Sequence, residues 1–288
     1  MKEMIQVSSL VKRYSNKYVL NAISFAAYEG EIMALLGTNG AGKTTTLECI
    51  EGLRKYENGE IKLGGRLGVQ LQSSSLPNEI HAKEALTFFS KWNHTKVDKS
   101  VFDALGISEF VNKQYKQLST GQKRRLHLAI ALIGDPDIII LDEPTAGLDV
   151  EGRVALHRLI KKLNNDGKTF LIASHDMSEV EELCDRVVIL KDGKIEYTGT
   201  VDELTRNSHE SYHIELKTDS KMRYASLTFC TWMGESKGYQ SYDVTDINHG
   251  LTELINVHNA NNIEIFDLKV EKTSLEKRFI EIAKEGIA

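Results

Sequence analysis

The sequence has few cysteines, and they form no recognisable pattern. Cys49, Cys184 and Cys230 are the only three, and they lie far apart along the chain. Their spacing matches no metal site, and their odd number fits no disulfide framework. This usage is typical of a reducing cytoplasm. The N-terminal residues Met1-Lys2-Glu3-Met4 lead straight into a strand-like stretch, so we expect no signal peptide.

Long apolar runs and an excess of basic residues are also missing. No run approaches the roughly 20 apolar residues that a membrane-spanning helix needs. If the protein works at a membrane, we expect another chain to hold it there. The formal net charge is −5, so the chain has no overall basic field. This charge argues against DNA or RNA as the main partner. It does not exclude a local basic patch.

One stretch combines a glycine-rich turn with a lysine and threonines. It reads Gly37-Thr38-Asn39-Gly40-Ala41-Gly42-Lys43-Thr44-Thr45 and fits G-x-x-x-x-G-K-[ST] at every fixed position. The apolar run 31–36 before it is typical of a buried strand, and residues 44–52 after it have helical spacing. A simple Gly-rich turn between strand and helix is the alternative. It would need neither Lys43 nor Thr44, so we prefer a phosphate-binding loop.

These residue types suit a triphosphate. Glycines let the main chain curl until its N–H groups face the phosphate oxygens, and the helix N-terminus adds the positive end of its dipole. Lys43 would bring a mobile cation to the β- and γ-phosphates, and the Thr44 hydroxyl would bind Mg²⁺. The stretch therefore predicts a site for a nucleoside triphosphate with Mg²⁺.

Two carboxylates follow the most apolar run in the chain. Residues 138–141 read Ile-Ile-Ile-Leu and predict a central parallel strand, which ends at Asp142-Glu143. Parallel strands deliver their C-terminal residues to the ligand crevice. We expect Asp142 to stand beside Mg²⁺ and hold it through water, and Glu143 to polarise the attacking water as general base. Two exposed carboxylates at a strand end are the simpler alternative, which the phosphate loop disfavours.

Alternating strand and helix patterns predict an α/β core with a mostly parallel sheet, an antiparallel β subdomain and a helical insertion at about 78–135. The pattern changes near 205–208, which gives predicted domains at 1–208 and 209–288. The second reads as a small α+β domain without a catalytic constellation. Asp246 is expected to cap one of its helices, with Leu251, Leu254, Ile255 and His258 on one face. Thr273 is expected to cap a last amphipathic helix.

The motifs together resemble the nucleotide-binding subunit of an ATP-binding cassette (ABC) transporter over roughly residues 5–205. Residues 118–122, Leu-Ser-Thr-Gly-Gln, resemble the family signature LSGGQ, with Thr120 in place of the first glycine. The order of the phosphate loop, the signature, Asp142, Asp149 and His175 also agrees with the family. The resemblance implies a phosphate-loop NTPase fold, ATP and Mg²⁺ as ligands, and ATP hydrolysis.

The resemblance also implies roles for single residues. Tyr14 matches the adenine-stacking aromatic residue, although its position alone fits an ordinary surface or core tyrosine equally well. Gln72 matches the glutamine that contacts Mg²⁺ and the attacking water, with Gln70 as its competitor. His175 matches the histidine that hydrogen-bonds the γ-phosphate. Contacts to ATP held by the opposite subunit are implied for Ser119, Gly121, Gln122 and Asp149.

These roles imply a head-to-tail dimer in which each ATP lies between Lys43 of one copy and Ser119 of the other. The second cassette is a second copy or a related subunit, and the dimer would drive an integral membrane permease from the cytoplasmic face of the membrane. Ser274-Leu275-Glu276-Lys277-Arg278-Phe279 and residues 67–76 resemble ATPases that export drugs, peptides and other amphiphiles. One departure is the short segment between Gly64 and Gly68, which predicts a trimmed antiparallel subdomain.

Two other functions are weighed against export. A soluble ABC-type ATPase acting on the ribosome or nucleic acid usually carries two cassettes or a long coiled coil, whereas this chain has one phosphate loop, one signature and no sustained heptads. A regulatory module with a dead site would not need Lys43, Asp142, Glu143 and His175. The sequence therefore favours an export ATPase that works with a separate membrane chain.

Overall fold

The computed structural model describes residues 2–70, 76–95, 99–206, 212–219 and 227–272, together with Phe279 and Ile282. The chain separates into two compact units, Met1–Thr200 and Val201–Ala288. The boundary expected from the sequence lies a few residues later, just beyond helix α7 (Val201–Arg206). No helix in the described ranges is long and apolar enough to cross a membrane.

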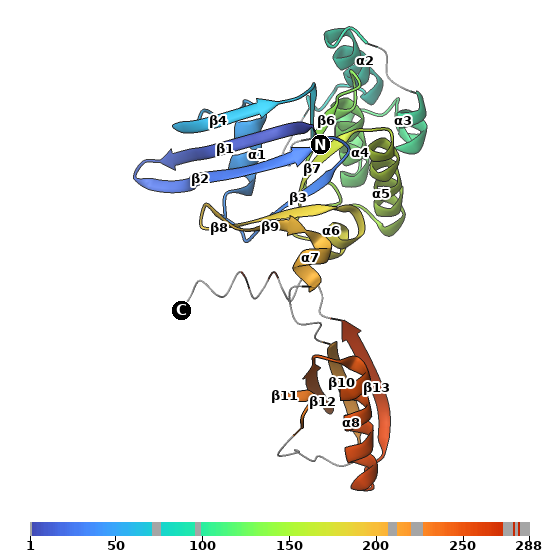
Figure 1. Cartoon of the computed structure of the whole chain (residues 1–288). Coiled ribbons are helices and arrows are strands. Elements are labelled where there is room, and N and C mark those ends of the chain that lie inside the picture. Colours follow the sequence, from blue (N-terminus) through green and yellow to red (C-terminus); the bar gives the residue numbers. More distant parts are fainter. Residues whose placement is uncertain are drawn as a thin grey trace. The chain divides into compact units, whose positions relative to one another are not determined.

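A six-stranded sheet forms the centre of the first unit (Figure 1). Its strands pair in parallel except for the last two, which form an antiparallel hairpin. Asp192-Gly193 closes this hairpin with positive φ at both residues, as the Asp-Gly signal predicts. The strands in order across the sheet are β5 (Leu67–Gln70), β6 (Ile138–Asp142), β7 (Thr169–Ala173), β3 (Ile32–Gly37), β8 (Arg186–Lys191) and β9 (Lys194–Thr200).

The sheet is built from apolar runs because both of its faces are covered. Every residue of β3, β6 and β7 is buried, which explains why these strands show continuous rather than alternating hydrophobicity. The run at 138–141 thus forms an interior parallel strand, as predicted, paired to β5 on one side and β7 on the other. It therefore carries Asp142 to the carboxyl edge of the sheet.

A second, antiparallel sheet of three strands has the order β2-β1-β4. It contains β1 (Glu3–Tyr14), β2 (Lys17–Tyr28) and β4 (Asn58–Leu63), and its buried side chains share one core with helix α1 (Lys43–Ile50). The short Gly64–Gly68 segment links β4 of this sheet to β5 of the six-stranded sheet. The outer ends of β1 and β2 form an exposed hairpin held by backbone pairing.

Helices surround the six-stranded sheet. The helical insertion contains α2 (Ala82–Trp92), α3 (Lys99–Ala104) and α4 (Thr120–Ala131), with 3₁₀ turns at Ile107–Glu109 and Tyr115–Gln117. The helices α5 (Val150–Asn165) and α6 (Met177–Leu183) follow β6 and β7.

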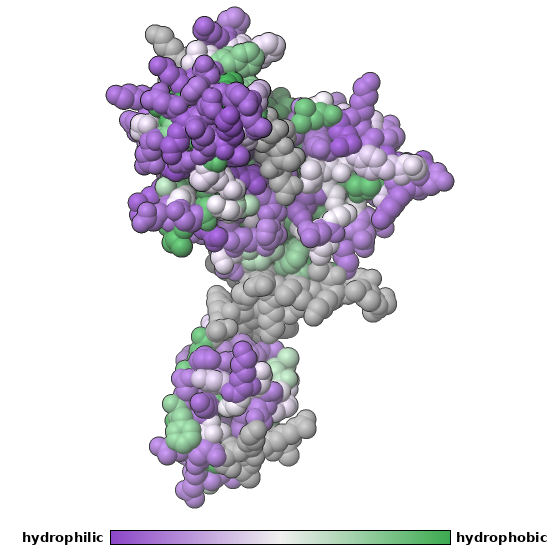
Figure 2. Space-filling model, turned by 180° about the vertical axis from the view of Figure 1, so that it is seen from behind, coloured by the Kyte–Doolittle hydropathy of each residue, from purple (hydrophilic) through white to green (hydrophobic). Residues whose placement is uncertain are grey.

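Figure 2 shows a largely hydrophilic face on which apolar side chains form small, separate patches. The described fold is therefore the predicted α/β core with an antiparallel subdomain and a helical insertion.

The second unit is an antiparallel sheet with one long helix. Asp246 caps α8, as predicted, by accepting bonds from the N–H groups of Asn248 and His249. Of the four residues predicted to share a face of α8, Leu254 and His258 are buried, whereas Ile255 is exposed. The Thr273 cap and the last amphipathic helix lie outside the described residues, apart from Phe279 and Ile282. The elements are β10 (Tyr212–Thr218), β11 (Cys230–Ser236), β12 (Tyr239–Val244), α8 (Ile247–Ala260) and β13 (Ile265–Lys272), with strand order β11-β12-β10-β13.

Candidate functional site

The loop between β3 and α1 has the backbone that a phosphate site requires. Gly40 and Gly42 have φ of 82° and 112°, a region that side chains other than glycine rarely adopt. A Cβ atom on Gly42 would also lie 2.7 Å from Cδ2 of Leu20. Thr38, Asn39 and Gly40 are exposed, while Gly37, Ala41 and Gly42 are buried. The loop is thus anchored at both ends and open in its middle.

The N-terminus of α1 keeps its donors available. Gly42 precedes the helix and no side chain caps it, so the first N–H groups remain suited to an anion. Thr44 and Thr45 lie in the first turn, and Thr44 is exposed. Lys43 folds back over the loop, where its Nζ donates to the carbonyl oxygens of Gly37 at 2.6 Å and Thr38 at 3.3 Å. All fixed positions of the motif therefore meet at one loop.

Lys43 faces the two carboxylates at the end of β6. Burial lowers the pKa of Lys43 below its usual value, and the negative charges of Glu143 and Asp142 oppose that shift. Asp142 is 5% exposed, and burial followed by repulsion from Glu143 raises its pKa. The sheet thus concentrates negative charge beside a cationic loop, an arrangement that a cation between Asp142 and a phosphate would stabilise.

Glu143 and His175 lie directly against each other in the site. Oε2 of Glu143 lies 2.6 Å from Nδ1 of His175, although the two residues follow different strands, β6 and β7. Glu143 has φ of 53°, an uncommon value for a residue with a side chain. Its N–H donates to the carbonyl of Ala173, which fixes this turn at the end of β7. The two predicted catalytic residues are therefore brought together by parallel strand pairing.

The signature residues stand at the start of α4. Ser119 caps this helix by accepting from the N–H of Gln122 at 3.2 Å, and Gln122 Oε1 accepts from the N–H of Ser119 at 3.1 Å. Thr120 contacts the loop before α5, where a Cβ on Gly147 would lie 2.9 Å from its methyl carbon. The threonine that departs from the LSGGQ pattern thus fits against a glycine. Gly121 is partly buried in the first turn.

Asp149 lies at the end of this same loop. It caps α5 by accepting from the N–H of Gly152 at 2.8 Å, and Asp149 itself is exposed. The signature and the Asp149 loop therefore pack together within one chain. Lys43, Asp142, Glu143 and His175 form a second group around the phosphate loop.

Three further sequence candidates have different outcomes. Tyr14 ends β1 with 41% of its surface exposed, and Lys12 Nζ and Arg54 Cζ lie 5.4 Å and 5.3 Å from its ring centroid. Gln72 lies outside the described residues. Gln70, its competitor, is 2% exposed, and neither polar atom of its amide has a hydrogen-bond partner among the described residues.

Gln70 borders a cavity of about 420 Å³ between the helical insertion and α5. Asp103, Arg124, Pro144 and Asp149 also line it. No residue of the phosphate loop does, so this cavity is separate from the loop that the sequence identifies. Among the described residues, no group of three His, Cys, Asp or Glu side chains could hold a metal ion. A metal here would therefore need oxygen atoms beyond these side chains.

Sequence patterns did not reveal Glu51, a carboxylate at the end of α1. Both of its oxygens are buried and lack a hydrogen-bond partner among the described residues. Burial raises the pKa of Glu51 to about 7, and Asp142 and Glu48 add to the effect. A single glutamate before a helix-ending glycine gives no signal of this burial, because the burial depends on tertiary packing.

Replacing Glu51 by Gln is expected to stabilise the protein at pH 8. The folded-state pKa of this carboxyl lies above its unfolded value, so its stabilising contribution is present at low pH and is lost as pH rises from about 4.5 to about 7. Glu51→Gln should raise the free energy of unfolding by about 1–2 kcal/mol at pH 8 and by much less at pH 5. Urea unfolding at both pH values measures this. Glu3→Gln, at an exposed position, is the control, and equal gains at both pH values would contradict the prediction.

Comparisons with known proteins agree with this geometry. A family model described as "ABC transporter" matches residues 20–146. An uncharacterized ABC transporter ATP-binding protein of Methanocaldococcus jannaschii is 38% identical, over 72% of this chain and 81% of its own. The linearmycin resistance ATP-binding protein LnrL of Bacillus subtilis is 30% identical, over 97% of this chain and 98% of its own. A Nod factor export ATP-binding protein I of Burkholderia orbicola is 38% identical, over 66% of this chain and 68% of its own.

Solved structures share the same fold. The dimeric structure of MJ0796, described as a bacterial ABC transporter cassette, is 28% identical with a TM-score of 0.62, covering 68% of this chain and 98% of that one. A second structure of that cassette is described as a dimeric post-hydrolysis state bound to ADP and Pi; it is 27% identical with a TM-score of 0.62, over 68% of this chain and 98% of that one. Neither comparison extends over the whole chain.

Proposed function

The chain belongs to the family of ABC transporter ATP-binding proteins and is an ATPase of that family, and we propose that it powers export of a drug, peptide or other amphiphile through a separate membrane-spanning subunit. The pairing of Glu143 with His175 beside Lys43 is the observation that carries the hydrolytic part. The printed names of two relatives, one for linearmycin resistance and one for Nod factor export, support the direction of transport.

Each of the proposed site residues has a role in this hydrolysis. The loop amides and Lys43 bind the phosphates and draw charge toward the β–γ bridge. Glu143 accepts a proton from water as the water oxygen attacks the γ-phosphorus, and the bond to the β–γ bridging oxygen breaks to give ADP and phosphate. His175 lies beside the Glu143 carboxylate and hydrogen-bonds the γ-phosphate. Tyr14 stacks on the adenine, and Gln72 positions the water.

Mg²⁺ fits the residues present at this site. Asp142 is a buried carboxylate whose pKa is already raised by burial and by Glu143, and Thr44 offers an exposed hydroxyl in the first turn of α1. Hard oxygen donors of this kind suit Mg²⁺, which commonly takes one or two protein ligands together with phosphate oxygens. Bound there, Mg²⁺ would neutralise phosphate charge, while Asp142 and Thr44 orient it.

The dimer is proposed to close on ATP. The exposed Ser119, together with Gly121, Gln122 and Asp149, would contact the γ-phosphate bound at the Lys43 loop of a second cassette. Two such sites arise in a head-to-tail pair, so ATP bridges the subunits and its hydrolysis releases them. The dimeric cassettes among the structural relatives support this assembly. The membrane subunit would hold the dimer at the cytoplasmic face of the membrane.

Copurification from gently solubilised native membranes tests the transport role. We expect a tagged chain to retain a polypeptide with several apolar spans, because the described residues contain no membrane-crossing helix of their own. Mass spectrometry identifies the retained chain, and an untagged strain is the control. Recovery of ribosomal proteins or nucleic acid without a membrane chain would favour a soluble ATPase instead, and the nucleotide chemistry would still stand.

A further inference from the structure

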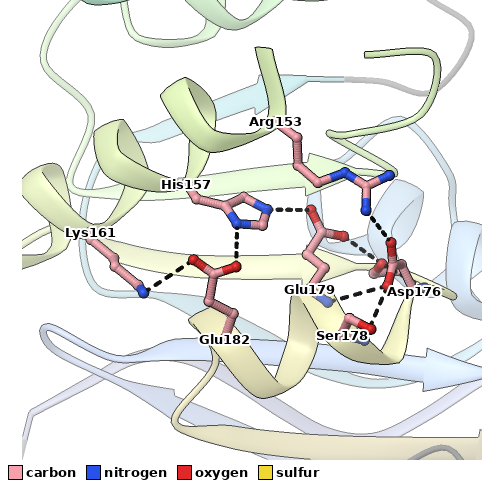
Figure 3. Close-up of polar contacts among 8 residues, drawn as sticks. Arg153, His157, Lys161, Asp176, Ser178, Glu179 and Glu182 are labelled. Atoms are coloured by element: carbon pink, nitrogen blue, oxygen red, sulfur yellow. Dashed lines mark hydrogen bonds and ion pairs between the residues drawn. The ribbon is translucent and has the colours of Figure 1, made fainter. Parts of the chain in front are cut away.

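A buried histidine joins the two helices that follow the catalytic strands. His157 lies in α5 and is 4% exposed. Its Nδ1 lies 2.9 Å from Oε2 of Glu182, and its Nε2 lies 3.7 Å from Oε1 of Glu179, both in α6 (Figure 3). The second distance is too long for a hydrogen bond, so the contact with Glu179 is an ion pair when the imidazole is charged. The ring is thus held between two carboxylates.

Glu179 connects this histidine to the loop of the candidate site. Glu179 is 2% exposed, and its Oε2 accepts a hydrogen bond of 2.5 Å from Ser174 Oγ. Ser174 precedes His175 directly, and its Oγ also accepts from the N–H of Asp176 at 3.1 Å. The hydroxyl of Ser174 therefore fixes the backbone on one side of His175 and is itself fixed by Glu179. A continuous set of contacts leads from His157 to the residue beside His175.

A second contact ties the same loop to the start of α5. Arg153 Nη1 donates to Asp176 Oδ2 at 3.0 Å, and Asp176 caps α6 through the N–H groups of Ser178 and Glu179 (Figure 3). Because α5 begins directly after Asp149, these contacts couple the Asp149 loop to the His175 loop. The two helices are thus joined by a buried contact through His157 and by a more exposed contact through Arg153.

The charges around the imidazole favour its protonated form. The Glu179 carboxylate is the main cause that raises the pKa of His157 above its usual value; burial opposes it, and Glu182 adds to it. Further charged groups nearby include Lys161, whose Nζ lies 3.5 Å from Glu182 Oε1, and Arg153 with Asp176 (Figure 3). Cys184, buried at the end of α6, interacts with Glu179, which helps burial to raise the thiol pKa. On α3, which also packs against α5, Asp103 lines the cavity beside Ala155 and Leu156.

We propose that His157 is a positioning residue for ATP hydrolysis: as an imidazolium it holds Glu179, and through Ser174 the loop of His175, in register with the helix that begins at Asp149. This rests on the roles proposed for His175 and Asp149. With a neutral imidazole, the attraction for the buried Glu179 carboxylate is lost and the loop is held less firmly. The positioning effect is therefore present below the raised pKa and is lost as pH rises through it.

The test compares kcat and KM for ATP in the full chain from pH 6 to pH 9. We expect His157→Gln to lower kcat on the order of 3- to 30-fold near pH 6.5 with KM unchanged, since the group touches no nucleotide. The ratio of wild-type to variant kcat should approach one at pH 9, where the wild-type imidazole is neutral. Taking the ratio removes titrations that both proteins share.

Three further variants control the result. His157→Lys keeps a cation at pH 9, so its kcat there should exceed that of both wild type and His157→Gln. Glu182→Gln keeps Glu179 but removes one of the charges that raise the pKa of His157. The positioning effect should therefore be lost at a lower pH than in wild type. This variant still tests the proposal if His157→Gln folds poorly. Lys161→Ala, which contacts only Glu182 in this group, should behave as wild type. The proposal is overturned if His157→Gln loses thermal stability but keeps wild-type kcat per folded molecule, or if the kcat ratio is independent of pH.

Glu143→Gln in the same assay separates this inference from the proposed function. If wild type hydrolyses ATP and Glu143→Gln does not, the roles around His175 stand and the His157 variants test the positioning effect alone. If wild type and Glu143→Gln have equal turnover, the proposed catalytic roles fail first, whatever the His157 variants show.

Discussion

Glu143→Gln is expected to abolish ATP turnover while leaving ATP binding intact. The substitution keeps the size of the side chain and its place beside His175, but an amide cannot accept the proton from the attacking water. Loss of a general base lowers turnover by about 10²- to 10⁴-fold. Phosphate release measures hydrolysis, and binding of a fluorescent ATP analogue measures affinity. Because ATP then persists, the variant should also accumulate as an ATP-dependent dimer in size-exclusion chromatography.

A matched control separates this effect from a general loss of charge. Glu151→Gln removes a carboxylate that lies a few residues further along the chain and is exposed in the first turn of α5. That variant should hydrolyse ATP at nearly the wild-type rate. Unchanged turnover in Glu143→Gln would remove Glu143 from the role of base. Weakened ATP binding in Glu143→Gln would instead mean that the carboxylate supports the phosphate loop. Its negative charge there counteracts the effect of burial, which lowers the pKa of Lys43.

The core of the site was predictable because its residues sit on local signals. The phosphate loop joins a fully buried strand to a helix, and the Asp142-Glu143 pair ends an equally buried strand. In both places a continuous apolar run is followed directly by glycines or by carboxylates. This pattern can be recognised without knowledge of the tertiary structure. The exposed outer parts of β1 and β2 give no such signal, because backbone pairing rather than an apolar pattern holds them together.

The network around His157 could not be predicted in the same way. His157, Ser174 and Glu179 come from α5, the end of β7 and α6, and no short motif joins them. Their contact depends on how two helices pack after adjacent parallel strands, so only the fold brings the three side chains together. The burial of Glu51 has the same origin. Helical spacing, in contrast, shows which residues of α8 share a face, but only the packing shows that Leu254 is buried and Ile255 is exposed.

A mixed-dimer experiment gives the second large effect, because Lys43 and Ser119 are proposed to serve one ATP from different subunits. Lys43→Ala removes the cation that donates over the phosphate loop, and Ser119→Arg places a large side chain at the exposed start of α4. Each variant alone should be almost inactive, since both sites of its dimer are damaged. Mixing the two puts both substitutions at one site of a mixed dimer and leaves the other site wild type.

Equal mixing should therefore restore about a quarter of wild-type turnover, since about half of the dimers are mixed and each has one intact site. Turnover plotted against mixing ratio should peak near equal amounts. The control is the double variant Lys43→Ala, Ser119→Arg mixed with wild type: each mixed dimer then carries one substitution at each site, so mixing should only reduce activity. If single variants never complement, Lys43 and Ser119 do not meet at a shared site. If the double variant leaves wild-type activity undiminished, hydrolysis does not require the dimer, and a head-to-tail arrangement has no part in this ATPase.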